Sequence, residues 1–251
     1  MVRRRAVPAT EQVAADARLP LLYRTLSPLA AERHGRLAIR AERDFGFASE
    51  VSAVPLTVDE FPQAMRSYPI VIAAGASPMP VALVGFQAGR NDHVDAAGAW
   101  SPGAYIPAYV RRYPFCLLRE SQASDRNILC ADLSSTLLTE VPGEGTALFD
   151  GGKPSERLSA ILDFCNRFET AMQRTRAVMA EASQLDLIAP SAVTVTRGER
   201  SLRVEGFSVI AEERLRELSD ATLAGLARRG VLGLYTAHQL STLNFSAFGK
   251  D

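Results

Sequence analysis

The chain has 251 residues, of which 47% are hydrophobic and 22% are charged, so it is long enough to bury a core as one large domain or two small ones. Its 28 Lys and Arg residues balance its 28 Asp and Glu residues, and the formal net charge is zero. A neutral chain has no overall field that attracts polyanions, so we expect neither nucleic acid nor a membrane among its partners.

The N-terminal residues and the cysteines both favour a cytoplasmic protein. Residues 1–19 contain three consecutive arginines but no apolar core of the kind that a secretory signal needs, so we expect a flexible leader there. Cys116, Cys130 and Cys165 are widely spaced and have apolar neighbours. This pattern favours buried free thiols in a reducing compartment over disulfides or a zinc site.

We expect the first half of the chain to consist mainly of β-strands. Alternating or apolar residues predict strands at 36–40 and 45–54, and the apolar runs at 70–73 and 81–86 predict a hairpin. These segments are short and are separated by glycine and proline. They are typical of an antiparallel sheet with tight connections.

Capping and proline patterns mark the changes between helix and strand. Thr57 is followed three residues later by Glu60, a capping-box pattern that predicts the start of a short helix. Tyr68-Pro69 and Tyr113-Pro114 each precede an apolar run. Because proline disfavours helical dihedral angles in the residue before it, each pair predicts the end of a helical segment and the start of a strand.

The second half of the chain has helical periodicity. Apolar residues recur every three or four positions from Leu158 to Leu185, which predicts a long amphipathic helix over about 155–185. The expected buried stripe of this helix comprises Leu158, Ile161, Leu162, Cys165, Phe168, Met172, Met179, Ala182 and Leu185.

A hairpin and further helices are predicted after the long helix. Residues 192–196 and 201–205 have the alternation of two strands joined by a turn at 197–199. Ser219 is a predicted N-cap, and Gly230 separates its helix from a last one that ends near Leu243.

These elements predict an α+β fold in a single domain over residues 20–251. The strands of the first half and the later hairpin form a largely antiparallel sheet. The long amphipathic helix packs across that sheet, and the C-terminal helices complete the core.

The candidate ligand-binding residues are Trp100, Tyr105, Arg111 and Arg112. Guanidinium groups among aromatic rings suit the recognition of a carboxylate or a peptide terminus. The alternative is that one arginine pairs with an acidic neighbour such as Asp132 while the rings fill the core. The leading hypothesis is therefore a protein that binds a peptide or a small acidic ligand here.

His34 is a fifth candidate ligand-binding residue and the one candidate for catalysis. As a base it would need a carboxylate such as Asp132 or Asp95, and the sequence places no second His or Cys nearby to complete a metal site. His93 is expected to be exposed in a polar turn, and His238 to pack on the last helix. The sequence contains none of the common catalytic or nucleotide-binding motifs, so no cofactor is predicted.

Several short motifs, in their order along the chain, resemble the SapC family of bacterial proteins. The residues that carry the resemblance are Leu21-Leu-Tyr23, Val84-Gly-Phe86, Trp100, Tyr105-Ile-Pro107, Arg111-Arg-Tyr-Pro-Phe115, Ala147-Leu-Phe-Asp150 and Glu205-Gly-Phe207. The resemblance extends from about residue 20 to the C-terminus. It implies an association with bacterial surface layers, and it carries no catalytic residues.

Three classes of function stay open at this point. The first is a non-catalytic cytoplasmic binding or accessory protein, and the second is an enzyme that uses His34 with a carboxylate. The third is a self-associating component related to surface layers. The sequence leaves the oligomeric state undecided.

Overall fold

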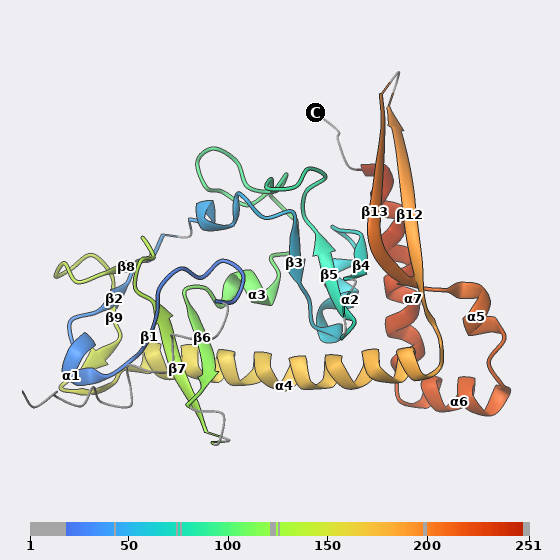
Figure 1. Ribbon diagram of the computed structural model, residues 1–251. Coiled ribbons are helices and arrows are strands. Elements are labelled where there is room, and N and C mark those ends of the chain that lie inside the picture. Colours follow the sequence, from blue (N-terminus) through green and yellow to red (C-terminus); the bar gives the residue numbers. More distant parts are fainter. Residues whose placement is uncertain are drawn as a thin grey trace, which may run out of the picture. The chain divides into compact units, whose positions relative to one another are not determined.

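The computed structural model describes residues 19–42, 44–73, 75, 77–120, 124, 126–197 and 200–247. The expected leader lies outside these residues apart from Leu19, and so does the expected turn at 197–199 apart from Arg197. The helices and antiparallel sheets confirm the predicted α+β class (Figure 1).

The chain forms two compact units, each built from two stretches of sequence. Unit 1 consists of Met1–Asp44 and Arg112–Arg167, and unit 2 consists of Phe45–Arg111 and Phe168–Asp251. That the two units fold and unfold together as a single domain stays a prediction.

Unit 1 contains short antiparallel strands. One sheet has the order β1 (Leu26–Pro28), β7 (Asn127–Asp132), β6 (Phe115–Arg119), and another has the order β8 (Leu138–Thr139), β2 (Ala38–Ile39), β9 (Thr146–Ala147). A further pair is β10 (Phe149–Asp150) with β11 (Lys153–Pro154), and the one-turn helix α1 spans Ala31–His34. The strand predicted at 36–40 is therefore present as β2, and β6 follows Tyr113-Pro114 as predicted.

The core of unit 1 forms where β6 and β7 meet the start of the long helix. Phe115, Ala131, Leu148 and Leu158 are buried in one hydrophobic cluster together with Cys165. All three cysteines of the chain lie within the described residues, are buried and form no disulfide there. Burial raises the pKa of the Cys130 thiol to about 11, so this group is protonated and a poor nucleophile at neutral pH.

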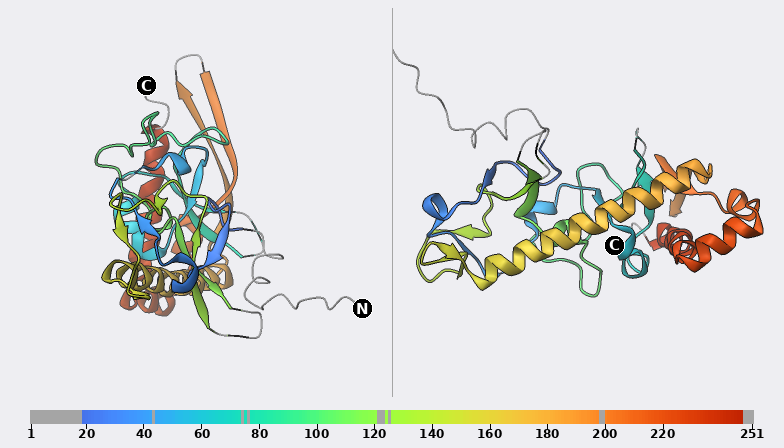
Figure 2. Two further views of the ribbon diagram at one scale, coloured as in Figure 1. Left: turned by 90° about the vertical axis from the view of Figure 1, so that its left-hand side faces the viewer. Right: turned by 90° about the horizontal axis from the view of Figure 1, so that it is seen from below.

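Unit 2 is built on a five-stranded antiparallel sheet. Its order is β12 (Ile188–Arg197), β13 (Arg200–Ile210), β4 (Ile70–Ala73), β5 (Met79–Leu83), β3 (Ala53–Pro55). Both predicted hairpins are present, and they share one sheet because β13 pairs with β4 at Phe207 and Ser208. The β12–β13 hairpin continues past β4 as a two-stranded ribbon (Figures 1 and 2).

Short helices accompany this sheet in unit 2. They are η2 (Gly46–Ala48), η3 (Val58–Glu60), α2 (Phe61–Ala64), α3 (Ala108–Arg111), α5 (Glu212–Arg216), α6 (Asp220–Arg228), α7 (Val231–Ser241) and η4 (Thr242–Ala247). The predicted cap of α6 is confirmed, since the Ser219 side chain accepts a hydrogen bond from the Thr222 amide. Gly230 adopts a left-handed conformation between α6 and α7, which suits glycine at the end of a helix.

The long helix α4 spans Glu156–Gln184, close to the predicted range, and is continuous in all views (Figure 2). Most of the predicted stripe is buried or half-buried, but Leu162 is 38% exposed. Thr175, which the apolar pattern did not single out, is fully buried. Its hydroxyl accepts a hydrogen bond from the Val58 amide at 2.9 Å, so it holds η3 against α4.

The strand predicted at 45–54 is wrong for most of its length. Residues 46–48 form η2, and only Ala53 and Val54 of that segment belong to β3. The cause is a tertiary contact: Asn91 donates its side-chain amide to the Ala48 carbonyl and its backbone amide to the Ser49 carbonyl. These bonds satisfy two backbone carbonyl groups of a tight turn, which the local sequence does not predict.

Within the described residues, no helix is both long and apolar enough to span a lipid bilayer.

Candidate functional site

The five sequence-predicted ligand-binding residues fall into both units. Trp100, Tyr105 and Arg111 belong to unit 2, whereas Arg112 and His34 belong to unit 1. The boundary between the units thus falls between the two adjacent arginines.

His34 ends α1 of unit 1 and is buried. Its Nδ1 accepts a hydrogen bond from the Ala30 amide at 3.1 Å. Burial, assisted by the charge of Arg33, lowers the pKa of this imidazole, so it is neutral at pH 7. The ring therefore serves as an acceptor for the start of its own helix.

Asp132 lies at the end of β7 in the same unit and is completely buried. Its carboxylate accepts hydrogen bonds from the amides of Arg24 (2.7 Å), Thr25 (3.1 Å) and Ser134 (3.1 Å), and from the Ser134 hydroxyl (2.6 Å). None of these bonds involves His34. The residue thus anchors loops, and the hydrogen bond that a His34–Asp132 catalytic pair requires is not formed.

Arg112 is buried in unit 1, with its guanidinium carbon 5.7 Å from the centre of the Tyr23 ring. The Tyr23 hydroxyl donates to the Phe115 carbonyl at 2.6 Å, and this ring also lies 5.3 Å from that of Tyr113. Arg112 therefore takes part in the packing of unit 1 through a cation–π contact.

Tyr105 and Arg111 belong to a network around the buried Glu60 in unit 2. Glu60 Oε1 accepts hydrogen bonds from the Tyr105 hydroxyl at 3.0 Å and the Ala108 amide at 2.6 Å. Arg111 donates to the Tyr105 hydroxyl at 3.0 Å, and its side chain is exposed. Burial, reinforced by the Glu60 charge, raises the pKa of Tyr105 to about 12, so its hydroxyl remains a donor at neutral pH.

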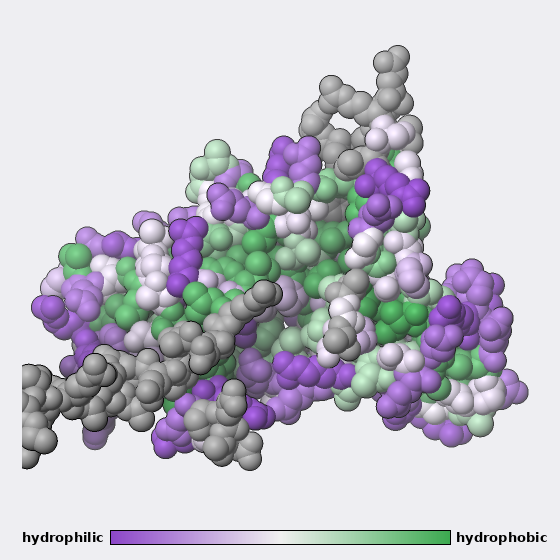
Figure 3. All heavy atoms as spheres, viewed as in Figure 1, coloured by the Kyte–Doolittle hydropathy of each residue, from purple (hydrophilic) through white to green (hydrophobic). Residues whose placement is uncertain are grey.

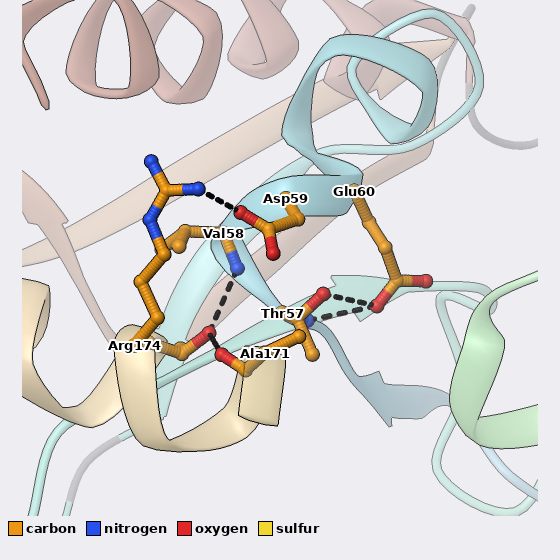
Figure 4. A network of polar contacts seen from close by, with 7 residues as sticks. Thr57, Val58, Asp59, Glu60, Ala171 and Arg174 are labelled. Carbon is orange, nitrogen blue, oxygen red and sulfur yellow. Dashed lines mark hydrogen bonds and ion pairs between the residues drawn. The ribbon is translucent and has the colours of Figure 1, made fainter. Parts of the chain in front are cut away.

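The other oxygen of Glu60 completes the predicted capping box. Glu60 Oε2 accepts from the Thr57 amide and the Thr57 hydroxyl, both at 2.9 Å (Figure 4). Beside this turn, Arg174 of α4 forms an ion pair with Asp59 at 2.5 Å (Figure 4). Each oxygen of this buried carboxylate therefore accepts two hydrogen bonds from the fold. Glu60 stabilises the structure and is not available to a ligand.

Trp100 belongs to an aromatic cluster centred on the buried Tyr68. The Trp100 Nε1–H donates to the Tyr68 hydroxyl at 2.9 Å, and that hydroxyl donates to the Tyr105 carbonyl. The His93 ring meets the Tyr68 ring edge-on, with centroids 4.8 Å apart, and lies nearly parallel to the Trp100 ring at 6.3 Å. The Phe45 ring meets the Trp100 ring edge-on, with centroids 5.6 Å apart.

The expectation that His93 is exposed was wrong, because its ring is half-buried against Tyr68 and Trp100. Burial lowers its pKa although the Asp92 charge opposes the shift, so the imidazole is neutral at pH 7. Its Nδ1 is buried and has no hydrogen-bond partner among the described residues. His93 is thus a polar group that this part of the fold leaves incompletely bonded.

A cavity of about 390 Å³ opens beside this cluster in unit 2. It is lined by Arg90, Asn91, Asp92, His93, Val94, Asp95, Ala99, Trp100, Ser101 and Pro102. The loop that forms it is held by its own bonds, including the Ser101 amide to the His93 carbonyl at 2.8 Å. Gly85 is required where this loop meets β5, since a Cβ there would lie 1.8 Å from the Arg90 carbonyl oxygen.

The charged groups of this cavity form only some of the hydrogen bonds and ion pairs that they could form. Arg90 Nε contacts Asp92 Oδ1 at 2.9 Å, and no other contact of its guanidinium is found in the described part of the chain. Asp95 Oδ1 accepts from the amides of Ala97 and Ala99, both at 2.9 Å. Asp95 Oδ2 has no donor within the described residues, so one cation and one carboxylate oxygen remain available to a ligand.

The cavity contains Ser, His and Asp side chains, but they do not form a catalytic triad. The Ser101 hydroxyl points to the His93 backbone carbonyl at 3.4 Å and not to its ring. Asp92 is bonded to Arg90 and to the Phe86 amide. A serine nucleophile needs a hydrogen bond to the imidazole that removes its proton, and this geometry does not supply one.

Unit 1 has a second cavity of about 420 Å³, lined by Arg40–Glu42 and Gly143–Thr146. It contains no aromatic side chain, and its Arg40 pairs with Glu144 at 2.7 Å. Among the described residues, no group of three or more His, Cys, Asp and Glu side chains is placed to hold a metal ion. The cavity beside Trp100 is therefore the better candidate site.

Sequence reasoning found Trp100, Tyr105 and Arg111 but missed the residues that join them, Glu60 and Tyr68. The capping-box pattern was a signal for Glu60, although it gave only a local role to this residue. Tyr68 was noted for the proline that follows it. No sequence signal identified Arg90 or His93 as residues that line a cavity.

Comparison with known proteins identifies the chain at the level of a family. Searches of the curated proteins and of the solved structures found no match. The family model described as SapC matches residues 29–248, which include most of both units. The chain therefore belongs to the SapC family.

Proposed function

We propose that this SapC-family protein is a non-catalytic binding protein of the cytoplasm, and that it holds a short peptide or an amino acid in the cavity beside Trp100. The observation that supports this most strongly is the combination in one cavity of an indole ring, a guanidinium group and a carboxylate oxygen that accepts no hydrogen bond from the described part of the chain. Ligand sites typically combine an apolar wall with a few such polar groups.

The size of the cavity favours a small ligand. Its volume of about 390 Å³ lies near the lower end of the usual range for small-molecule sites, about 300–1,000 Å³. A single amino acid or a dipeptide fits this space better than a nucleotide cofactor does. Trp100 and Pro102 provide apolar surface for a side chain of such a ligand.

The charges favour a ligand that carries both signs. The terminal nitrogens of Arg90 suit a carboxylate, and Asp95 Oδ2 suits an ammonium group. A small ligand with only acidic groups would meet two carboxylates, Asp92 and Asp95, for one cation. An α-amino acid or peptide matches the cavity better than a dicarboxylate, which narrows the ligand class expected from the sequence.

The bonding of the polar groups supports binding without catalysis. Ser101 and His93 are not bonded to each other through the imidazole, and Glu60 and Asp132 are each saturated by donors of the fold. A general base needs a free acceptor within reach of the substrate. The neutral His93 ring lines the cavity as a polar group, and its position does not suit activation of a nucleophile.

Intrinsic fluorescence offers a direct test, because Trp100 is the only tryptophan of the chain. We expect a saturable change in emission when the purified protein is titrated with a panel of amino acids and dipeptides. Dicarboxylates without an amino group serve as the comparison. Mass spectrometry of small molecules that co-purify with the protein identifies the physiological ligand independently.

Charge-neutral variants test the two polar contacts. We expect Arg90→Gln and Asp95→Asn each to weaken binding by about tenfold, the equivalent of ~1.4 kcal/mol. Arg36→Gln is the matched control, since Arg36 forms an exposed ion pair with Glu140 in unit 1. If no panel member changes the Trp100 emission, or if all three variants bind alike, the proposed site is wrong.

A further inference from the structure

The strand β12 is an edge of the five-stranded sheet of unit 2. It pairs with β13 along its whole length, from Ile188 opposite Ile210 to Arg197 opposite Arg200. No other strand of the sheet pairs with its outer side within the described residues. A strand edge presents backbone N–H and C=O groups that can pair with another strand.

The register shows which residues direct these groups outward. The Leu187 carbonyl accepts from the Ala211 amide, so the odd-numbered residues from Leu187 onward bond to β13. A bulge lies on β13, where two residues oppose Ala192, and it leaves the alternation along β12 unchanged. The backbone groups that point away from β13 are therefore those of the even-numbered residues Pro190, Ala192, Thr194 and Thr196.

The outer edge is covered only at its start. Arg214 Nη1 reaches the Ile188 carbonyl at 3.5 Å, and Pro190 has no N–H to offer. From Ala192 to Thr196, no hydrogen bond to these outward groups is formed by any described residue. Strand edges are commonly protected by lysine, proline or charge, and this five-residue segment has none of them.

The two faces of β12 differ. Val193 and Val195 pack toward the cluster of Val71, Phe207 and Phe245, while Ala192 and Thr194 are exposed. Figure 3 shows that the visible face of the hairpin is mostly white to purple, without a large apolar patch. A partner strand would therefore bind through the unpaired backbone edge of β12 and not through an apolar face.

We propose that β12 pairs antiparallel with β12 of a second copy of this chain, about a two-fold axis at Thr194. The sequence Val193-Thr194-Val195 is symmetric about that residue. Thr194 then lies opposite the second copy's Thr194, and Val193 lies opposite the second copy's Val195. Threonine pairs and β-branched pairs are favourable cross-strand neighbours.

The charge pattern supports a second copy as the partner. No charged residue occurs from Ile188 to Thr196, and the proposed register places Arg197 opposite the second copy's Ser191. Like charges therefore do not meet across the axis. The pairing gives a continuous antiparallel sheet, and its two-fold symmetry closes the assembly at a dimer because each copy uses its one free β12 edge.

The test compares the full-length chain with two variants by sedimentation velocity over a series of protein concentrations. We expect the wild type to be dimeric at high concentration and to dissociate on dilution. Thr194→Pro removes the outward N–H at the axis and should abolish the dimer. It should keep the hairpin, because this N–H does not bond to β13 and Pro190 already occupies an equivalent position.

Thr194→Val is the matched control, since it keeps the N–H and the β-branched shape and should dimerise like the wild type. Circular dichroism of dilute samples shows whether each variant is folded. If Thr194→Pro does not fold, Thr194→Glu replaces it: the glutamate lies opposite Arg203 in its own hairpin but opposite the same glutamate in the dimer.

Three outcomes would overturn the proposal. They are a wild type that stays monomeric at every concentration, a dimer that survives Thr194→Pro or its Thr194→Glu replacement, and a dimer that Thr194→Val also loses. A photo-crosslinking residue in place of Thr194 identifies the partner directly. We expect crosslinked peptides that contain β12 from both copies. A crosslink to a different protein would instead show that the partner of β12 is a strand of that protein and not a second copy of this chain.

Discussion

The turn at Glu60 and the loop at Asp95 both place a carboxylate in unit 2, but the fold uses them to very different extents. Glu60 is buried and accepts four hydrogen bonds, two of them from residues more than 40 positions away. Asp95 is exposed, and only one of its oxygens accepts bonds, both from its own loop. A saturated carboxylate holds elements together, whereas an unsaturated one is available to a ligand.

The largest expected effect is the difference in stability between variants that remove these two carboxylates. Glu60→Ala leaves the Ala108 amide, the Tyr105 hydroxyl and the Thr57 cap without their acceptor, and should lower the free energy of unfolding by about 4 kcal/mol. Asp95→Ala should cost about 1 kcal/mol, since its donors are near solvent. Urea unfolding measures both, and equal losses would contradict the distinction.

A second prediction applies the comparison to two histidines of unit 2. His238 is buried and its Nε2 accepts from the Ile210 amide at 3.0 Å, whereas His93 Nδ1 has no partner among the described residues. Burial lowers the pKa of His238 to about 4 from its usual 6.5. The unfolded chain therefore binds this proton first as the pH falls.

Stability should consequently be complete above pH 6.5 and decline toward pH 4, by about 3 kcal/mol from this group. The pKa values of His34 and His93 are also lowered by burial, so they act in the same direction. Urea unfolding at several pH values measures the slope. His238→Gln should reduce it, and an unchanged slope would show that other groups cause the acid loss.

A third prediction concerns the contact of η3 with α4. Thr175→Val keeps the shape of the side chain but leaves the Val58 amide without its buried acceptor, and should cost about 2 kcal/mol. Thr175→Ser retains the hydroxyl and should be clearly milder. Thermal melts of both variants check this order, and the reverse order would mean that the methyl group matters more than the hydrogen bond.

The smallest expected effect concerns the adjacent arginines. Arg112→Lys replaces the planar guanidinium by an ammonium group, which should weaken a buried cation–π contact at a cost of about 1 kcal/mol. Arg111→Lys changes an exposed side chain that bonds Tyr105 and the Ile106 carbonyl, and should cost less than about 0.5 kcal/mol. If thermal melts show the larger loss for Arg111, its bonds to Tyr105 are more important to the fold than its exposure indicates.

Features that depend on near neighbours in sequence were predicted correctly. The capping box of Thr57 and Glu60, the strands after both Tyr-Pro pairs and the Ser219 cap each need only a few adjacent residues. The hairpins and the long helix follow from periodicity over one element. In each case the local preference and the final fold agree.

The failures depend on distant partners. The segment at 45–54 has apolar alternation, but Asn91 holds part of it in a turn. A polar Thr175 belongs to the buried side of α4 because Val58 needs an acceptor there. The cavity is likewise formed by a loop whose ring contacts, between His93, Tyr68 and Trp100, no local pattern encodes.

The interleaving of the two units has a genetic consequence. The chain passes from one unit to the other three times, at residues 44–45, 111–112 and 167–168, the last of these inside α4. Neither unit is encoded by one uninterrupted stretch, so a single recombination event cannot transfer a whole unit to another gene. Exchange within the coding sequence would instead combine parts of a unit from two parents, which favours inheritance of the entire region as one block.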